Sequence, residues 1–170
     1  MVAESMGSQQ LLAELAGRGY QGRTLSVRRL AELQEGIESH RREGRFDEQF
    51  ARTRLSFFQY SPPETFPEPQ SLIIVAVPRP QTAAVFTWRG QQVSLIIPPT
   101  YTDYRKIAQR VADLLTGILA PAGHRVALSL LPLKSLAVRS WLAAYGRNNV
   151  CYVPGMGSFL ELVGLYMAGR

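Results

Sequence analysis

The chain has 170 residues, of which 46% are hydrophobic, and its 19 Lys and Arg exceed its 13 Asp and Glu to give a formal net charge of +6. This length supports one buried core but not two, so we expect a single domain over residues 1–170. Cys151 is the only cysteine, which excludes an internal disulfide and a multi-cysteine site, and we expect no bound metal. No apolar run approaches the roughly 20 residues of a membrane span, and the first residues lack the apolar core of a signal peptide. We therefore expect a cytoplasmic protein that makes no membrane contact.

The first part of the chain, residues 1–60, is predicted to be mainly helical. Apolar residues at helical spacing predict helices that begin near Ser8, Val27 and Asp47, with a short strand within residues 20–27. The first helix is expected to end at Gly17 or Gly19. The second has only a modest apolar stripe, and its charged end, which contains His40, is expected to face solvent. The segment 60–70 then holds four prolines, which predicts an irregular loop.

The remainder, residues 71–170, is predicted to be the sheet-rich core. The aliphatic run 71–78 is typical of a central strand buried on both faces, and the runs 82–88 and 91–97 predict a hairpin that turns at Arg89-Gly90. A long helix is expected from an N-cap at Thr102 or Asp103 to about residue 120. A strand at 124–130, a helix from Pro132 to Gly146 and a final strand at 159–167 complete the chain. The expected class is an α/β (α+β) fold with a central mixed sheet flanked by helices.

The segment 146–158, GRNNVCYVPGMGS, combines three glycines, two asparagines and the single cysteine. Gly146 can adopt the left-handed conformation that ends a helix, and the later glycines permit a tight turn. Two interpretations follow: a helix cap with an ordinary turn, or a backbone wall that lets a flat ligand approach closely. Cys151 is predicted to be a small buried hydrophobe within a strand.

The run LPLKSLAVRSWLAAYGRNNVCYVPGMGSFLELVGLY, residues 131–166, resembles the characteristic segment of the epoxyqueuosine reductase family. The similarity lies in the pattern from Arg139 to Asn148, in the strand that follows, and in Gly157, Ser158 and Phe159; a second match is YTDYRK at residues 101–106. Members are cobalamin-dependent iron–sulfur reductases akin to reductive dehalogenases. The resemblance implies that the chain is an N-terminal cobalamin-binding portion whose cofactor contacts come from Tyr104, Arg139, Tyr145, Gly146, Arg147, Asn148, Asn149, Met156, Gly157 and Ser158.

The resemblance also implies a downstream ferredoxin-like module with two 4Fe-4S clusters, whose cysteines would begin after residue 170. One cysteine cannot ligate such clusters, so we expect that the chain alone has no reductase activity and depends on that module or another electron donor. The family usually has a proton-donating Asp just before the helix that starts the motif. The matching residues 127–135 include no carboxylate. The substrate therefore stays open, and Tyr104 or Tyr145 can act as the acid if nearby cations lower its pKa.

Two further classes of function remain open at the level of sequence. Five arginines (Arg41, Arg42, Arg45, Arg52 and Arg54) alternate with four phenylalanines (Phe46, Phe50, Phe57 and Phe58), a composition that can bind RNA weakly, without sequence preference and in a salt-dependent way. Alternatively, the chain is a non-catalytic interaction domain whose last strand, 159–167, packs on a partner. The oligomeric state is not predicted.

Overall fold

A four-stranded sheet forms the centre of the computed structural model, which describes residues 2–66, 68–97 and 104–169. Its strands lie in the order β1 (Gln21–Ser26), β2 (Ser71–Pro78), β8 (Leu160–Ala168) and β5 (Arg125–Leu128). The two interior strands pair along their full length, with Ile74 opposite Gly164. The predicted α/β class is confirmed, but every pair in this sheet is antiparallel in place of the expected mixed pairing.

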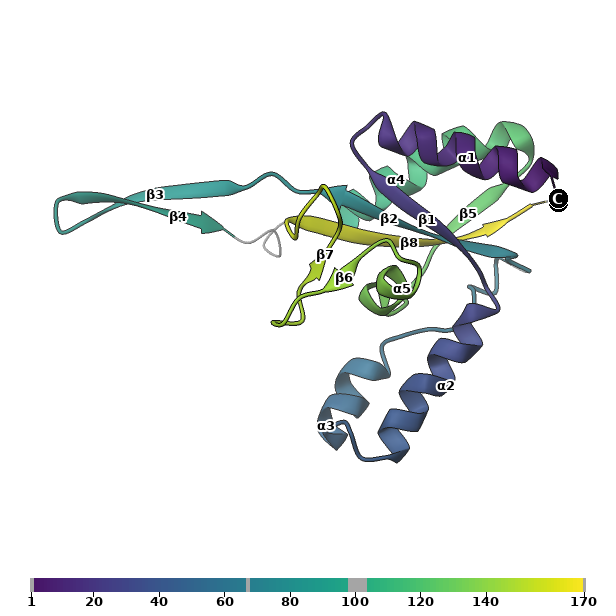
Figure 1. Cartoon of the computed structure of the whole chain (residues 1–170), viewed down its shortest axis with the longest axis horizontal. Coiled ribbons are helices and arrows are strands. Elements are labelled where there is room, and N and C mark those ends of the chain that lie inside the picture. The colour runs from purple at the N-terminus through teal and green to yellow at the C-terminus, as the bar shows by residue number, and fades with distance from the viewer. Residues whose placement is uncertain (1, 67, 98–103, 170) are drawn as a thin grey trace.

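Helices cover the two faces of this sheet, as Figure 1 shows. On one face lie α1 (Val2–Ala16) and α4 (Tyr104–Leu119), which is followed by the short helix η3 (Ala120–Ala122). Their apolar residues pack on the odd-numbered residues of β2 and β8, such as Val75 and Val163. On the other face lies α5 (Leu133–Arg139), which packs with Leu136 against Ile74 and Tyr166. Strand β2 is buried on both faces because it lies between these two layers, as predicted.

The residues between β1 and β2 form a helical lobe below the sheet (Figure 1). It contains α2 (Arg29–Arg42), α3 (Glu48–Phe50) and one π-helical turn (Ala51–Leu55). Leu30 and Leu33 bury the predicted apolar stripe of α2, and Asp47 caps α3 by accepting a hydrogen bond from the Phe50 amide at 2.8 Å. The described residues of the proline-rich segment 60–70, which are all but residue 67, are irregular, as predicted.

The hairpin β3 (Thr82–Trp88) and β4 (Gln91–Ile97) has the predicted turn, with φ of 51° at Arg89 and 78° at Gly90. It does not join the central sheet, contrary to the expectation that these strands belong to the core. Instead it extends away from the body as an arm (Figure 1). Every residue of β3 is exposed, so its apolar side chains contribute little to the core.

The helix predicted to run from Pro132 to Gly146 is wrong in its second half. Helix α5 ends at Arg139, and Trp141 adopts a left-handed φ of 60°. The amides of Leu142 and Ala143 both donate to the Ala137 carbonyl, at 2.9 and 3.1 Å. This turn buries both side chains. In a continuing helix, the two side chains would point in successive directions around the helix axis. The chain then forms β6 (Ala144–Tyr145), which pairs with β7 (Cys151–Tyr152).

The two ends of the chain also differ from the sequence predictions. Helix α1 begins at Val2 and not at Ser8, and the predicted N-cap of α4 at Thr102 or Asp103 lies outside the described residues.

Strand β8 lies between β2 and β5 with its middle residues buried, so it is not a free surface for a partner. Among the described residues, no helix is long and apolar enough to cross a membrane.

Candidate cofactor-binding site

The β6–β7 hairpin carries the central part of the motif. Its loop is closed by two hydrogen bonds, from the Gly146 amide to the Val150 carbonyl at 2.9 Å and from the Asn149 amide to the Gly146 carbonyl at 3.0 Å. Asn149 adopts a left-handed φ of 59°, which asparagine tolerates better than most residues. Arg147 and Asn148 are exposed at the tip. The loop therefore offers a guanidinium and side-chain amides to solvent.

Gly146 is a glycine for a reason other than the predicted helix cap. It lies in this loop, and its φ is not among the positive values of the described residues. A Cβ at this position would lie 2.5 Å from Cε2 of Tyr152, far inside van der Waals contact. The ring of Tyr152 thus packs directly over the backbone at Gly146, and the helix-cap interpretation is wrong.

Helix α5 holds this hairpin in place through three contacts. Lys134 Nζ donates to the Asn149 carbonyl at 3.2 Å, and the hydroxyls of Ser135 and Tyr145 lie 3.4 Å apart. Cys151 Sγ lies 4.0 Å from the Lys134 carbonyl. Burial raises the pKa of the Cys151 thiol, and the positive charge of Lys134 only partly opposes that shift. Cys151 is 5% exposed and sits in β7, which confirms the predicted small buried hydrophobe.

A second tight turn follows the hairpin at residues 153–157. The amides of Met156 and Gly157 both donate to the Val153 carbonyl, at 3.0 and 2.9 Å. Gln21 Nε2 donates to the Pro154 carbonyl at 2.9 Å, which attaches the turn to β1. Gly157 has a φ of 81°, and a Cβ there would meet nothing within 4 Å. The outer side of Gly157 is open space, and its glycine is required by backbone conformation and not by crowding.

Large apolar side chains are exposed around the hairpin. Trp141 is 88% exposed, and Tyr145, Tyr152 and Val150 are 45%, 42% and 37% exposed. Aromatic side chains in this setting leave apolar area uncovered. Trp141 and Tyr152 were not predicted from the sequence, although the aromatic residues within the motif were a usable signal. Tyr145 pairs with the buried Cys151 and Tyr152 pairs with Ala144, so the two tyrosines lie on opposite faces of the hairpin. The hairpin therefore exposes apolar area on both faces, beside the amides of its loop.

Two predicted contact residues lie apart from this surface. Arg139 ends α5, and one of its guanidinium nitrogens lies 3.3 Å from where a Cβ at Gly36 would be, so it packs against α2. Tyr104 lies in the first turn of α4, which covers the opposite face of the sheet. The remaining predicted residues gather in the hairpin and in the turn that follows it.

Tyr104 belongs to a different cluster of ionisable groups, with Glu161 and Arg79. Burial, and then the negative charge of Glu161, raise the pKa of Tyr104, which is opposite to the lowering expected for an acid. Burial raises the pKa of Glu161, and Arg79 partly lowers it. Glu161 was not predicted from the sequence, although a single carboxylate within an apolar strand was a signal for it.

Ser129 directly follows β5, in the segment where the family resemblance would place an aspartate. It is 6% exposed, and its Oγ has no hydrogen-bond partner among the described residues. Its amide donates to the Gly164 carbonyl at 3.0 Å, and a Cβ at Gly164 would lie 2.7 Å from Ser129 Oγ. A buried neutral hydroxyl therefore occupies this position.

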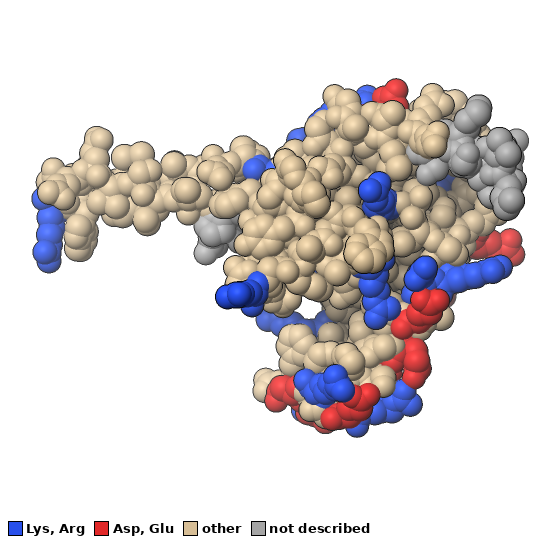
Figure 2. Space-filling model, in the orientation of Figure 1, with Lys and Arg blue, Asp and Glu red and all other residues tan. Residues whose placement is uncertain are grey.

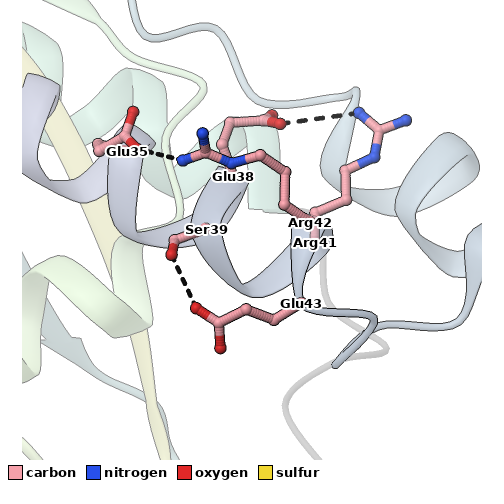
Figure 3. Close-up of polar contacts among 6 residues, drawn as sticks. All are labelled: Glu35, Glu38, Ser39, Arg41, Arg42 and Glu43. Atoms are coloured by element: carbon pink, nitrogen blue, oxygen red, sulfur yellow. Dashed lines mark hydrogen bonds and ion pairs between the residues drawn. The ribbon is translucent and has the colours of Figure 1, made fainter.

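The arginines of the helical lobe are largely neutralised by neighbouring carboxylates. Residues 28–54 include seven arginines and six carboxylates, and Figure 2 shows both charges mixed over the lobe. Figure 3 shows the pairs on α2, in which Arg42 contacts Glu35 and Arg41 lies 3.9 Å from Glu38. Phe50 and Phe57 are 46% and 62% exposed. The aromatic residues needed for stacking are available, but the lobe lacks the strong positive field expected for RNA binding.

The motif does not coincide with a metal centre or with the cavity that the structure shows most clearly. No group of three or more His, Cys, Asp or Glu within the described ranges could hold a metal ion. A cavity of about 650 Å³ opens at the other end of β8, between Leu11, Leu25, Leu119 and Met167.

Comparisons with known proteins give a likeness of fold. No protein-family model matches the chain, and no curated protein matches it by sequence. Solved structures do match, and they show that the chain has the fold of a part of longer proteins. One is epoxyqueuosine reductase from Bacillus subtilis, with its catalytic aspartate loop swung out of the active site. It is 16% identical to this chain, with a TM-score of 0.59, and the match spans 94% of this chain and 45% of the reductase chain.

Another is epoxyqueuosine reductase from Streptococcus thermophilus, which is 17% identical with a TM-score of 0.59 and covers 98% of this chain and 46% of that one. The chain thus has the fold of this part of epoxyqueuosine reductase and spans less than half the length of either structure. At this identity the likeness concerns the fold.

Proposed function

We propose that the chain is the N-terminal, cobalamin-binding portion of an iron–sulfur reductase related to epoxyqueuosine reductase. The observation that carries the proposal is that the fold matches cover nearly the whole chain, while most of the motif residues gather in one hairpin and the turn that follows it. The proposal needs both the fold match and the grouping of the motif residues, because neither identifies a cofactor alone. The substrate differs from chain to chain in such folds and is left unassigned.

The exposed surface fits one side of a corrin ring. Gly157 leaves room for a flat ring to approach the backbone, and the exposed aromatic side chains of the neighbouring hairpin offer apolar contact area. The Asn148 side chain and Arg147 can hydrogen-bond the amide and carbonyl groups at the ring's edge. Cobalamin, when bound, supplies the redox chemistry; the residues of this chain position it and exclude water from one side.

The iron–sulfur clusters belong to a separate partner in this proposal. The chain's one cysteine is buried and cannot hold a four-iron cluster. We therefore assign the clusters to a ferredoxin-like module or to another electron donor, and we expect the 170-residue chain alone to show no turnover. We also propose a cytoplasmic location, which the single unpaired cysteine supports.

A cobalamin titration followed by visible absorbance tests the proposal. Weak binding with a shift toward the base-off spectrum is expected. Gly157→Ala should abolish the shift, whereas Gly44→Ala should not, although Gly44 has a comparable φ of 68° and an equally open Cβ position. Both changes carry the same backbone penalty of about 1–2 kcal/mol, so only the position differs.

Two other variants separate surface contacts from packing. Arg147→Ala should weaken binding because its guanidinium is exposed on the loop, and Cys151→Ala should leave binding unchanged because the thiol is buried. An unaltered cobalamin spectrum, both with this chain and with a longer protein that includes the iron–sulfur module, would refute the assignment. The charge distribution predicts only weak RNA binding that decreases steeply with salt; selective binding of one RNA at physiological salt would favour the alternative.

A further inference from the structure

The arm formed by β3 and β4 exposes more apolar surface than a free hairpin should. Val85 and Trp88 are each 62% exposed, Ile96 is 58%, Leu95 is 55% and Phe86 is 43% exposed. The arm extends from the body without covering it (Figure 1). A two-stranded hairpin alone is only marginally stable in water, and clustered exposed apolar residues indicate a contact surface.

The two long edges of the arm have none of the usual protection against strand pairing. The ladder from Thr82↔Ile97 to Trp88↔Gln91 is continuous and contains no bulge. Neither strand includes a proline or a charged residue. Natural proteins use these devices to block edge-to-edge association, so their absence favours pairing with another strand.

The turn determines which backbone groups of β3 remain free. In a hairpin with a two-residue turn, the residues that flank the turn, Trp88 and Gln91, exchange hydrogen bonds, and every second residue does the same. Phe86 and Ala84 therefore point their backbone groups toward β4. Val85 points its N–H and C=O outward, to the free edge, as do Ala83 and Thr87.

A second copy of the same strand fits this free edge. When two β3 strands pair antiparallel about Val85, Val85 faces its own copy and Ala83 faces Thr87, so all outward groups find partners. On the neighbouring positions, Phe86 faces Ala84 and Trp88 faces Thr82. Each aromatic side chain then lies opposite a small one. The equivalent pairing of β4 about Ser94 would oppose Gln92 with Ile96, which is less complementary.

The charge distribution favours the arm as the contact between two copies. The chain carries a net charge of +6, so close approach of two bodies is unfavourable. The strands of the arm are uncharged, and in Figure 2 the arm is free of charge apart from the blue at its far end. Pairing through the arms lets two copies meet while their charged bodies stay apart.

We propose that the chain forms a two-fold symmetric dimer through antiparallel pairing of its β3 edges, centred on Val85, which creates a four-stranded ribbon in the order β4, β3, β3 and β4. Pairing of one strand edge buries less than about 1,200 Å², the range of weak and reversible complexes. The dimer is therefore expected to have a micromolar Kd. This inference is independent of the proposed cofactor.

Sedimentation equilibrium of the 170-residue chain, from about 1 to 300 µM, measures this association. Val85→Pro removes an outward N–H without removing a bond of the β3–β4 ladder, and proline is tolerated on strand edges. It should raise the dimer Kd about tenfold or more, because one hydrogen bond is lost from each copy. Ser94→Pro is the matched control: Ser94 faces Val85 in the ladder and points its N–H to the opposite edge, so its Kd should not change.

Each other outcome contradicts the proposal. A monomer at all concentrations would assign the arm to a different partner chain. A dimer that is weakened by Ser94→Pro and not by Val85→Pro would assign the contact to the β4 edge. A dimer that neither change affects would move the interface off the arm. Far-UV circular dichroism and the melting temperature should remain the same in both variants, because the arm lies outside the core.

Discussion

A carboxylate placed at Ser129 tests whether this chain can carry the family's aspartate in its present packing. We expect Ser129→Asp to be strongly destabilising at neutral pH. The residue is 6% exposed, and its Oγ has no partner in the described part of the chain. Leu133 and Ser129 both lie close over Gly164, so an apolar side chain packs beside the position that the carboxylate would take. Ser129→Asn introduces nearly the same volume without the charge and is the matched control.

The magnitude follows from the expected pKa. Full burial raises a carboxyl pKa by up to 3–5 units above its ordinary 3.9. Each unit corresponds to 1.36 kcal/mol, so at pH 7 the Asp variant should be about 2–4 kcal/mol less stable than the Asn variant. For a chain of this size that is a melting-temperature difference on the order of 10 °C. Because the folded pKa is raised, the penalty is present in full above it, decreases as the pH falls through it, and vanishes below about 3.9.

Urea denaturation of both variants between pH 3.5 and 8 measures this difference. The two unfolding free energies should converge at the acid end and separate as the pH rises. A difference below about 0.5 kcal/mol at pH 7 would refute the reasoning, because it would mean that solvent or a donor reaches the carboxylate. In that case an aspartate at this position would be compatible with the fold, and the absence of an aspartate here would affect the chemistry of the site and not the stability of the protein.

Three other changes have distinct expected results. Glu161→Gln should raise the melting temperature at neutral pH, since burial raises the pKa of Glu161 above its ordinary 4.5, and the gain should disappear as the pH falls to 4.5; a gain that persists in acid would exclude desolvation as its cause. Gly146→Ala should cost about 1–3 kcal/mol because its Cβ would meet the Tyr152 ring, whereas Gly117→Ala, in open space on α4, should gain about 0.5–1 kcal/mol in urea denaturation; equal effects would contradict this. Leu165→Ala, at a fully buried position of β8, should cost about 2–5 kcal/mol, and a cost below 1 kcal/mol would show that β8 is not central.

The local sequence pattern was sufficient to predict those elements whose structure depends only on their own residues. The aliphatic run of β2 predicted a strand buried on both faces, and the spacing of Ile107, Val111 and Leu115 predicted α4. Arg89-Gly90 predicted the hairpin turn, because its two positive φ values match what a two-residue loop requires. In each case the side-chain period or a backbone preference carries the information, and no distant residue is needed to read it.

Only the tertiary structure decided how these elements combine. The end of α5 depends on burying Leu142 and Ala143 in the core, and a continuous helical pattern gives no sign of that turn. The pattern of β3 and β4 likewise does not show whether a hairpin joins the sheet or leaves it. Glu161 and Tyr104 are far apart in sequence, and the effect of Glu161 on the pKa of Tyr104 arises only because β8 and α4 meet.

The candidate site shows the same division. The motif from Arg139 to Ser158 was recognisable from its residues, and most of it gathers in one hairpin and the turn after it, because these contacts are local. Arg139 turns to α2, and Gly146 is a glycine because of the Tyr152 ring. The sequence by itself determined which segments form helices, strands and turns, since those choices depend on neighbours along the chain. The faces they bury, the partners of the charges and the exposure of the arm depend on contacts between distant segments, which exist only once the chain is packed.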